Sequence, residues 1–183
     1  MPIAGTHFVR PAVSADFSAW KPLWDGYNAF YGRQPDEDIT RTTWARFSDP
    51  AEPMHALVVE QDGKLVGLVH YLFHRSTSMI APTCYLQDLF TSEALRGRGI
   101  GRVLIEDVYR RAREHGAERV YWQTHEKNLS AMKLYDQVAE RSGFVVYRHA
   151  LGIALMAGRP SLIYHSALTE EFRVTATPRG RHP

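Results

Sequence analysis

The sequence is poor in cysteine, and it has neither a long apolar run nor a large excess of charge of one sign. Cys84 is the one cysteine among 183 residues, which excludes an intrachain disulfide and a multi-cysteine zinc site. No apolar run approaches the ~20 residues that cross a bilayer. Residues 1–13 are too polar to hold the apolar stretch of a signal peptide. We therefore expect a cytoplasmic protein that does not act at a membrane.

Charge is nearly balanced, with 22 Lys+Arg against 20 Asp+Glu and a net charge of +2. A basic surface spread over the whole chain, typical of nucleic-acid-binding proteins, is therefore missing, and we predict no nucleic-acid partner. Arginines do gather locally, at positions Arg96, Arg98, Arg102, Arg110, Arg111 and Arg113. Nucleic-acid binding through this arginine-rich segment is an alternative that steep salt dependence would support.

The length suits one ordinary domain, and the sequence has no internal repeat. Apolar spacing and turn residues predict strands at 7–13, 56–61, 65–74, 83–90, 119–124, 144–147 and 151–155, and helices at 14–31, 36–47, 100–115 and 129–141. Ser14 and Asn128 are the expected N-caps, and Asp62 with Gly63 forms the expected hairpin turn. This order predicts a mixed α/β sheet of six to seven mostly antiparallel strands, flanked by about four helices.

The domain is expected over residues 5–157. The C-terminal extension, 158–183, is expected to hold an edge strand at 161–168 followed by a basic tail.

One glycine-rich turn carries a chemical signal. Gly97, Gly99 and Gly101 follow a predicted strand and open a predicted helix. Without Cβ atoms the backbone can turn tightly, so its N–H groups can gather at the helix N-terminus and bind phosphate oxygens. Arg102 stands where a dinucleotide fingerprint needs its third glycine, and a Walker pattern is missing. The plain alternative is a glycine-rich turn with solvated arginines.

The spacing Arg96-x-x-Gly99-x-Gly101 resembles the acetyl-CoA-binding motif of the GNAT family of N-acetyltransferases. Further along, the run from Asn128 through Ala131 and Leu134 to Tyr135 resembles the helix that follows in that family. The resemblance covers residues 5–150 in element order and is most specific over 83–147. Within the family it is most similar to the branch of histone, polyamine and spermidine/spermine acetyltransferases.

The resemblance implies the GNAT acyl-CoA N-acyltransferase fold, with a sheet that splays at its fourth strand and holds acetyl-CoA there without a metal. The residues that it matches to the cofactor site are Leu89, Phe90, Thr91, Arg96, Gly97, Arg98, Gly99, Ile100, Gly101, Arg102 and Asn128. Asn128 is equally well explained as a helix N-cap.

Tyr135 matches the tyrosine that stands near the thioester sulfur in the family. Coenzyme A leaves as a thiolate, and a phenol can protonate it. The general base is left open, because Gln87 occupies the position where spermidine/spermine acetyltransferases have a glutamate. Asp88 would point to the opposite face of a regular strand unless a bulge redirects it. The other candidates are His125, Glu126, a water chain, and attack by an already neutral amine.

The acceptor is expected to lie beside the first two helices. Asp36, Glu37 and Glu126 are the candidate substrate-binding carboxylates, although the first two equally suit a helix start. The stripe of Trp20, Trp24, Tyr27 and Tyr31 is more typical of a core than of a pocket. No third ligand accompanies His70 and His74, so we predict no metal site.

We therefore predict an N-acetyltransferase that moves an acetyl group directly from acetyl-CoA to a primary amine, such as a polyamine, a lysine or another small amine. The family resemblance also implies a homodimer that uses the last strands. The alternatives are a non-catalytic sensor of coenzyme A and an acyltransferase that uses another acyl-CoA.

Overall fold

The structure, a computed structural model, describes residues 7–151. The chain divides into two compact units, residues 1–142 and 143–183, and the regular elements belong to the first. They are β1 (His7–Pro11), α1 (Phe17–Phe30), α2 (Glu37–Arg46), β2 (Met54–Gln61), β3 (Lys64–His74), β4 (Thr83–Thr91), α3 (Ile100–Glu114), β5 (Arg119–Tyr121) and α4 (Leu129–Val138), with short 3₁₀ turns η1 (Ser14–Asp16) and η2 (Glu93–Leu95).

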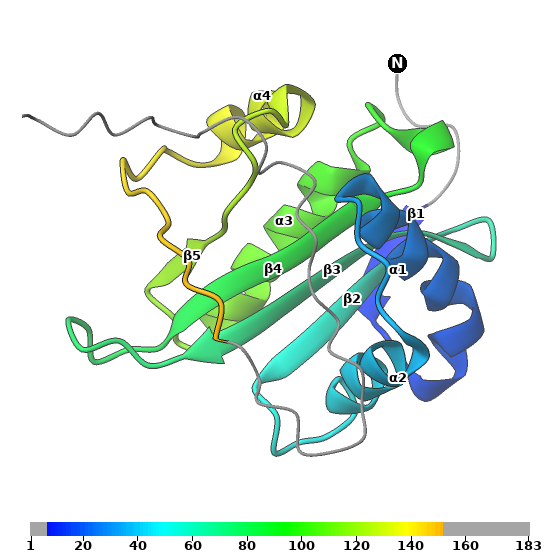
Figure 1. The fold of residues 1–183 in the computed structure, drawn as a ribbon, viewed down its shortest axis with the longest axis horizontal. Helices are drawn as coiled ribbons and strands as arrows, with labels where there is room; N and C mark the ends of the chain where they lie inside the picture. Colours follow the sequence, from blue (N-terminus) through cyan, green and yellow to red (C-terminus); the bar gives the residue numbers. More distant parts are fainter. Residues whose placement is uncertain (1–6, 152–183) are drawn as a thin grey trace, which may run out of the picture. The chain divides into compact units, whose positions relative to one another are not determined.

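The five strands form one sheet in the order β1-β2-β3-β4-β5 (Figure 1). Pairing is antiparallel except between β4 and β5, which are parallel. Asp62 and Gly63 both have positive φ, of 51° and 74°, as the tight hairpin between β2 and β3 requires. The mixed, mostly antiparallel sheet predicted from the sequence is therefore confirmed.

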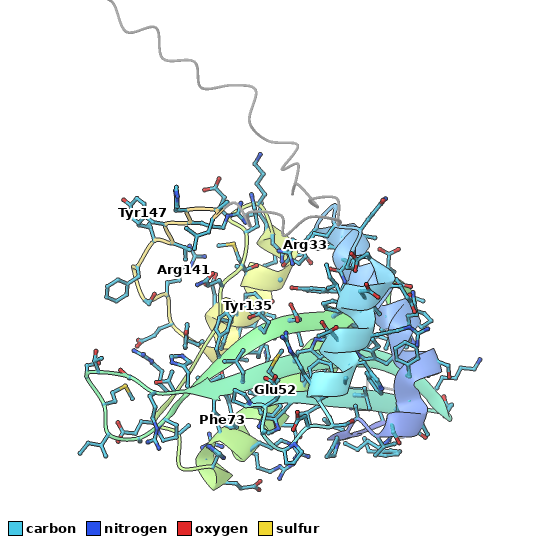
Figure 2. All side chains as sticks on the ribbon, turned by 60° about the horizontal axis from the view of Figure 1, so that its bottom comes forward. Arg33, Glu52, Phe73, Tyr135, Arg141 and Tyr147 are labelled. Atoms are coloured by element: carbon cyan, nitrogen blue, oxygen red, sulfur yellow. The ribbon has the colours of Figure 1, made fainter. Side chains whose placement is uncertain are left out.

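The sheet opens on one side of β4. Strand β5 pairs with β4 over Thr83–Tyr85 and ends at Tyr121, whereas β4 continues to Thr91. The chain beyond β5 runs to α4, which carries Tyr135 (Figure 2). Backbone groups in the second half of β4 therefore lack a strand partner on the β5 side among the described residues. This is the splay that the family resemblance implies at the fourth strand.

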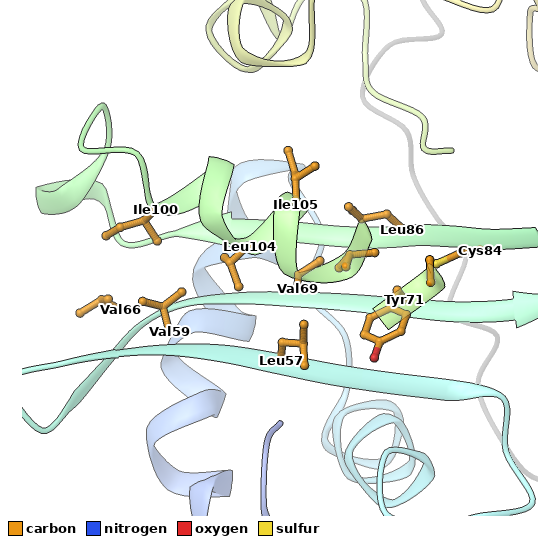
Figure 3. Close-up of a cluster of buried hydrophobic side chains, with 12 residues drawn as sticks. Leu57, Val59, Val66, Val69, Tyr71, Cys84, Leu86, Ile100, Leu104 and Ile105 are labelled. Carbon is orange, nitrogen blue, oxygen red and sulfur yellow. The ribbon is translucent and has the colours of Figure 1, made fainter. Parts of the chain in front are cut away.

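Two apolar cores lie on opposite faces of the sheet. On one face Ile100, Leu104 and Ile105 of α3 pack against β2, β3 and β4 (Figure 3). On the other face the aromatic residues of α1 pack with Leu68 and Phe90. The predicted stripe on α1 is thus core over most of its length, as expected, with Trp20 fully buried.

A β-bulge at Gln87 reverses which face the side chains of β4 occupy. Asp88 pairs with His70 and Leu86 pairs with Tyr71, so Gln87 has no opposite residue on β3. Before the bulge, Leu86 belongs to the core under α3; after it, Phe90 belongs to the core under α1. In a regular strand these even-numbered residues would share one face. The bulge therefore turns Asp88 toward α1 and leaves Gln87 exposed.

Some expected details are wrong. The apolar run Phe144–Tyr147 forms no strand, and its large side chains are exposed. Ser14 does not cap the first helix; instead the carboxylate of Asp16 accepts from the backbone N–H of Val13 at 2.8 Å. The strands expected at 151–155 and 161–168, and the extension from 158 onward, lie outside the described residues except for Leu151, which is not in a strand.

Candidate active site

A cavity of ≈ 480 Å³ lies where the sheet opens. Its walls come from the end of α1, the second half of β4, the turn into α3, and α4. The lining residues are Tyr27, Phe30, Tyr31, Leu89, Phe90, Thr91, Leu95, Arg96, Gly97, Gly99, Ile100, Gly101, Arg102, Asn128, Ser130, Ala131, Lys133, Leu134, Tyr135 and Gln137. The structure thus brings together Tyr135 and every residue predicted to bind the cofactor except Arg98.

The turn into α3 presents backbone donors to this cavity. Gly97 and Gly99 have φ of 75° and 86°, a left-handed conformation that favours glycine. Gly99 is the N-cap of α3 and has no side chain to cap the helix. Among the described residues, no acceptor bonds the backbone N–H groups of 99–102. Free donors at the positive end of a helix dipole form a binding site for anions such as phosphate.

Arginines add charge beside these donors. The Arg96 guanidinium lies 5.7 Å from the ring centroids of both Phe30 and Phe90, and it pairs with the exposed Glu93. Arg102 donates to Gln137 on α4. Further along α3, Arg110 and Arg111 are both paired with Asp107. Much of the arginine cluster is therefore engaged locally, which weakens the nucleic-acid interpretation.

Tyr135 lies on α4, and its ring packs against Trp122 with centroids 5.4 Å apart. Burial raises the pKa of Tyr135 to about 12, and Tyr31 contributes in the same direction. The phenol therefore keeps its proton at neutral pH and is able to donate it inside the cavity.

Asn128 lines the cavity at the start of α4. Its side chain makes no capping bond; Nδ2 donates to the hydroxyl of Thr124 at 3.1 Å. The side chain of Asn128 therefore does not cap α4 as expected.

The end of α1 forms the remaining wall of the cavity. Tyr27 and Tyr31 line it, with ring centroids 5.2 Å apart. The guanidinium of Arg33 lies 5.1 Å from the centroid of the Tyr31 ring. Arg33 is exposed and forms no ion pair with any residue in the described part of the chain. The aromatic stripe on α1 is thus core at Trp20 and Trp24 but pocket wall at its C-terminal end.

The predicted substrate carboxylates lie elsewhere. Asp36 caps α2 by accepting from the N–H of Ile39 at 2.7 Å, and Glu37 pairs with Arg41. Glu126 is exposed in the segment before α4. None of the three lines the cavity. The helix-start interpretation therefore accounts for the contacts of Asp36 and Glu37.

Other candidate groups are occupied or inert. Cys84 is fully buried, and burial raises the pKa of its thiol to about 12, so it is not a thiolate at neutral pH. His74 contacts the hydroxyl of Tyr121 at 3.0 Å. Within residues 7–151 no three His, Cys, Asp or Glu side chains gather as metal ligands. No helix in that range is long and apolar enough to cross a membrane.

Pairing across the sheet face produces contacts that sequence reasoning did not find. His70 joins Trp20 on α1 to Asp88 on β4, with 3.0 Å between the bonded atoms on each side. These residues are 50 and 18 positions away from His70 in the chain. No local pattern marks either contact; the apolar-face position of His70 within β3 was the only available signal.

A splayed sheet, free N–H donors at the start of a helix and a partly buried phenol are the features expected of a transferase of acyl groups carried on coenzyme A. Residues 19–139 match the Acetyltransferase (GNAT) family, and the chain belongs to that family. The chain is 36% identical over 142 residues to the D-amino-acid N-acetyltransferase HPA3 of Saccharomyces cerevisiae, covering 76% of this chain and 88% of the relative. It is 29% identical over 143 residues to the uncharacterized N-acetyltransferase YhfO of Bacillus subtilis, covering 76% and 94%.

Solved structures share the fold. The aminoglycoside N-acetyltransferase AAC(6')-Iy in complex with CoA gives a TM-score of 0.70 at 16% identity, covering 82% of this chain and 98% of that one. The ribosomal-protein-alanine N-acetyltransferase of Brucella melitensis biovar Abortus 2308 gives 0.69 at 20% identity, covering 80% and 99%. The predicted GNAT fold and acetyltransferase class are confirmed. The finer placement in the polyamine branch finds no support among these named relatives.

Proposed function

We propose that this protein transfers an acetyl group from acetyl-CoA directly to the primary amine of a small molecule. The observation that carries the proposal is the single cavity that joins the free N–H groups at the start of α3 to the protonated phenol of Tyr135. The first feature suits a pyrophosphate, and the second suits a sulfur that leaves as an anion.

Acetyl-CoA fits the cavity from the α3 turn toward the bulge. Its pyrophosphate would lie on the amides of 99–102, with Arg96 and Arg102 beside it. Its pantetheine amides would pair with the open edge of β4 over Leu89–Thr91, as an added strand does. Asn128 lines the same passage and is proposed to contact that arm.

The transfer needs positioning, a polarised carbonyl and one proton. Backbone N–H groups beside the bulge at Gln87 are suited to hold the thioester oxygen as it gains charge. When the amine displaces the thiolate, the C–S bond breaks and Tyr135 gives its proton to the sulfur. Bringing both substrates together in this cavity accounts for direct transfer without an acetylated enzyme.

The acceptor proposed here is a free amino acid. Arg33 does not line the cavity, but its guanidinium lies 5.1 Å from the ring of Tyr31, which does, and it forms no ion pair among the described residues. A cation beside the cavity suits a carboxylate better than a polyamine. The carboxylates that would favour a polyamine or a lysine tail, Asp36 and Glu37, are used at the start of α2. The name of the yeast relative points the same way.

The test is release of free thiol from acetyl-CoA with matched acceptors. We expect free amino acids, D and L, to be acetylated faster than their amides, polyamines, lysine peptides or aminoglycosides. Arg33→Gln should abolish the preference for the acid over its amide, whereas Arg113→Gln, an exposed arginine at the far end of α3, should keep it. Preference for a polyamine would overturn the acceptor class, and binding of coenzyme A without any turnover would favour a sensor.

A further inference from the structure

A chain of buried polar groups runs from α1 through the sheet to the cavity. The indole N–H of Trp20 donates to Nε2 of His70 at 3.0 Å, and Nδ1 of His70 lies 3.0 Å from Oδ2 of Asp88. Exposure is 0% for Trp20, 1% for His70 and 6% for Asp88, so water does not compete for these bonds. A buried polar network of this kind fixes the orientation of each member.

The bonding pattern settles where His70 carries its proton. An indole nitrogen is a donor only, so Nε2 of His70 must accept. The ring proton then sits on Nδ1 and is donated to Asp88. A second proton on Nε2 would break the bond to Trp20. The network therefore holds His70 neutral beside Asp88, so Asp88 does not have an imidazolium as its partner.

Tyr27 connects this carboxylate to the cavity. It is buried, it lines the cavity, and it belongs to the core on the α1 face of the sheet, the face toward which the bulge turns Asp88. Burial and the charge of Asp88 raise the pKa of Tyr27, so the phenol is protonated and able to donate to that carboxylate. A phenol that donates to a carboxylate still has lone pairs to accept an N–H from a molecule in the cavity.

We propose that Asp88 is the final acceptor of the proton that the acceptor ammonium must lose, and that the hydroxyl of Tyr27 passes it on. The inference rests on the proposed N-acetyltransferase function. Tyr27 would be a catalytic residue in contact with the amine, while His70 and Trp20 would be positioning residues that keep Asp88 ionised and correctly turned.

Each proton in this transfer has a donor and an acceptor. An N–H bond of the ammonium breaks as a new O–H bond forms on Tyr27, while the original O–H of Tyr27 breaks and one forms on Asp88. The amine then attacks the thioester carbon as a neutral nucleophile. The attacking nitrogen loses a second N–H proton as the amide forms, and this proton returns to the phenolate that Tyr135 becomes when it protonates the sulfur. Asp88 returns its proton to solvent after product leaves.

The surroundings of Asp88 favour this role over the other candidates. Its carboxylate interacts with titratable groups on α1, β3 and β4: Tyr27, His70 and Tyr85. Within the described part of the chain, no lysine or arginine forms an ion pair with Asp88. Neither Asp88 nor the rival bases His125 and Glu126 line the cavity; Asp88 is buried behind Tyr27, which does, whereas His125 and Glu126 are exposed.

The first test uses acceptors that differ in basicity, namely fluorinated analogues of an acceptor that the wild type acetylates. With a strongly basic amine we expect Tyr27→Phe and Asp88→Asn to lower kcat by about 10²–10⁴-fold, the range for general-base catalysis. With an analogue that is already neutral at the assay pH, the loss should shrink to a few-fold. Tyr71→Phe, a buried phenol on the other sheet face, is the matched control.

Retained binding of acetyl-CoA by calorimetry shows that a variant is folded. Equal losses with every amine would overturn the relay while leaving the acetyltransferase function intact. Absence of turnover by the wild type with any amine would instead overturn the proposed function.

The second test separates positioning from simple packing. Trp20→Phe keeps the ring but removes the N–H, so Nε2 of His70 becomes free to take a proton. The imidazolium would then pair with Asp88 and weaken it as a base. We expect Trp20→Phe to lower kcat with a strongly basic amine and to have little effect with the analogue that is already neutral at the assay pH. An equal loss with both amines would mean that Trp20 only packs.

Discussion

Two phenols line one cavity, and their neighbours suit them to different proton transfers. Tyr135 packs on Trp122, and no carboxylate in the described part of the chain contributes to its raised pKa. Burial and the charge of the Asp88 carboxylate raise the pKa of Tyr27. A phenol without a carboxylate partner gives a proton to an anion formed beside it, whereas one that adjoins a carboxylate passes a proton inward. In the proposed mechanism the same type of side chain therefore serves as an acid on α4 and as a relay on α1.

Removal of the Tyr135 hydroxyl is expected to lower kcat by about 10²–10⁴-fold, the usual contribution of general acid catalysis. Tyr135→Phe keeps the ring that packs on Trp122, so calorimetric affinity for acetyl-CoA should change little. Acyl donors whose thiols are more acidic need less protonation and should restore part of the rate. Unchanged turnover with acetyl-CoA would remove Tyr135 from the mechanism.

At the scale of elements, β4 determines how the site is built. The bulge at Gln87 turns Asp88 toward α1, and the missing pairing beyond Tyr85 leaves an edge for the cofactor. The residue pattern along the chain predicts β4 itself, but it does not reveal an inserted residue. The face of the sheet to which Asp88 points was therefore left open by the sequence. The glycine spacing at 97–101, in contrast, was readable because backbone geometry there depends directly on glycine.

Local patterns also explain which elements were misjudged. Phe144–Tyr147 has the apolar, β-branched composition of a strand, yet a strand exists only where another strand pairs with it. None of the described strands pairs with this run.

Pro22 lies inside α1 and is tolerated in its second turn. The hairpin at Asp62 was predictable because its turn chemistry lies within two adjacent residues.

An ion-pair cluster joins the first strand to its neighbours. Arg10 on β1 contacts Asp16 in η1 at 2.6 Å and Glu60 on β2 at 3.0 Å. Hydrogen bonding to Arg10 lowers the pKa of Asp16 below its usual value. A carboxyl whose pKa is lowered by folding stabilises the fold above its unfolded pKa, about 3.9, and loses that contribution as the pH falls through the folded value.

Asp16→Asn should therefore lower the free energy of unfolding by roughly 1.5–3 kcal/mol at pH 7, the scale of a hydrogen bond to a charged group. Urea unfolding at pH 7, 5 and 3 measures it. The difference in the free energy of unfolding between wild type and variant should be constant from pH 7 to 5 and become smaller below about pH 4. Asp25→Asn, which breaks the exposed pair with Lys21, should change the free energy of unfolding much less, because solvent screens that pair. A difference in the free energy of unfolding that persists unchanged at pH 3 would contradict a stabilising pair between ionised Asp16 and Arg10.

Across the first unit, the cavity is assembled from parts that different cores hold. The end of α1 rests on the aromatic core, whereas the start of α3 rests on the aliphatic core of the opposite sheet face. α4 contributes the third wall and packs on the same aliphatic core as α3. A cofactor that touches all three walls would tie together elements that two separate apolar cores hold. Binding should then stabilise the whole folded unit, because the unfolded chain has no such site.

Coenzyme A is expected to raise the melting temperature by about 5–10 °C at a hundred times its dissociation constant, which corresponds to about 2.7 kcal/mol in a domain of this size. Gly99→Asp should abolish this shift, because it places a side chain and a negative charge at a left-handed position beside the free N–H groups. Gly116→Asp is the matched control: the same change at a φ of 76°, just beyond the opposite end of α3. It should lower the melting temperature without ligand and keep the shift with ligand. An unaltered shift in Gly99→Asp, measured by calorimetry, would mean that the phosphates bind away from the start of α3.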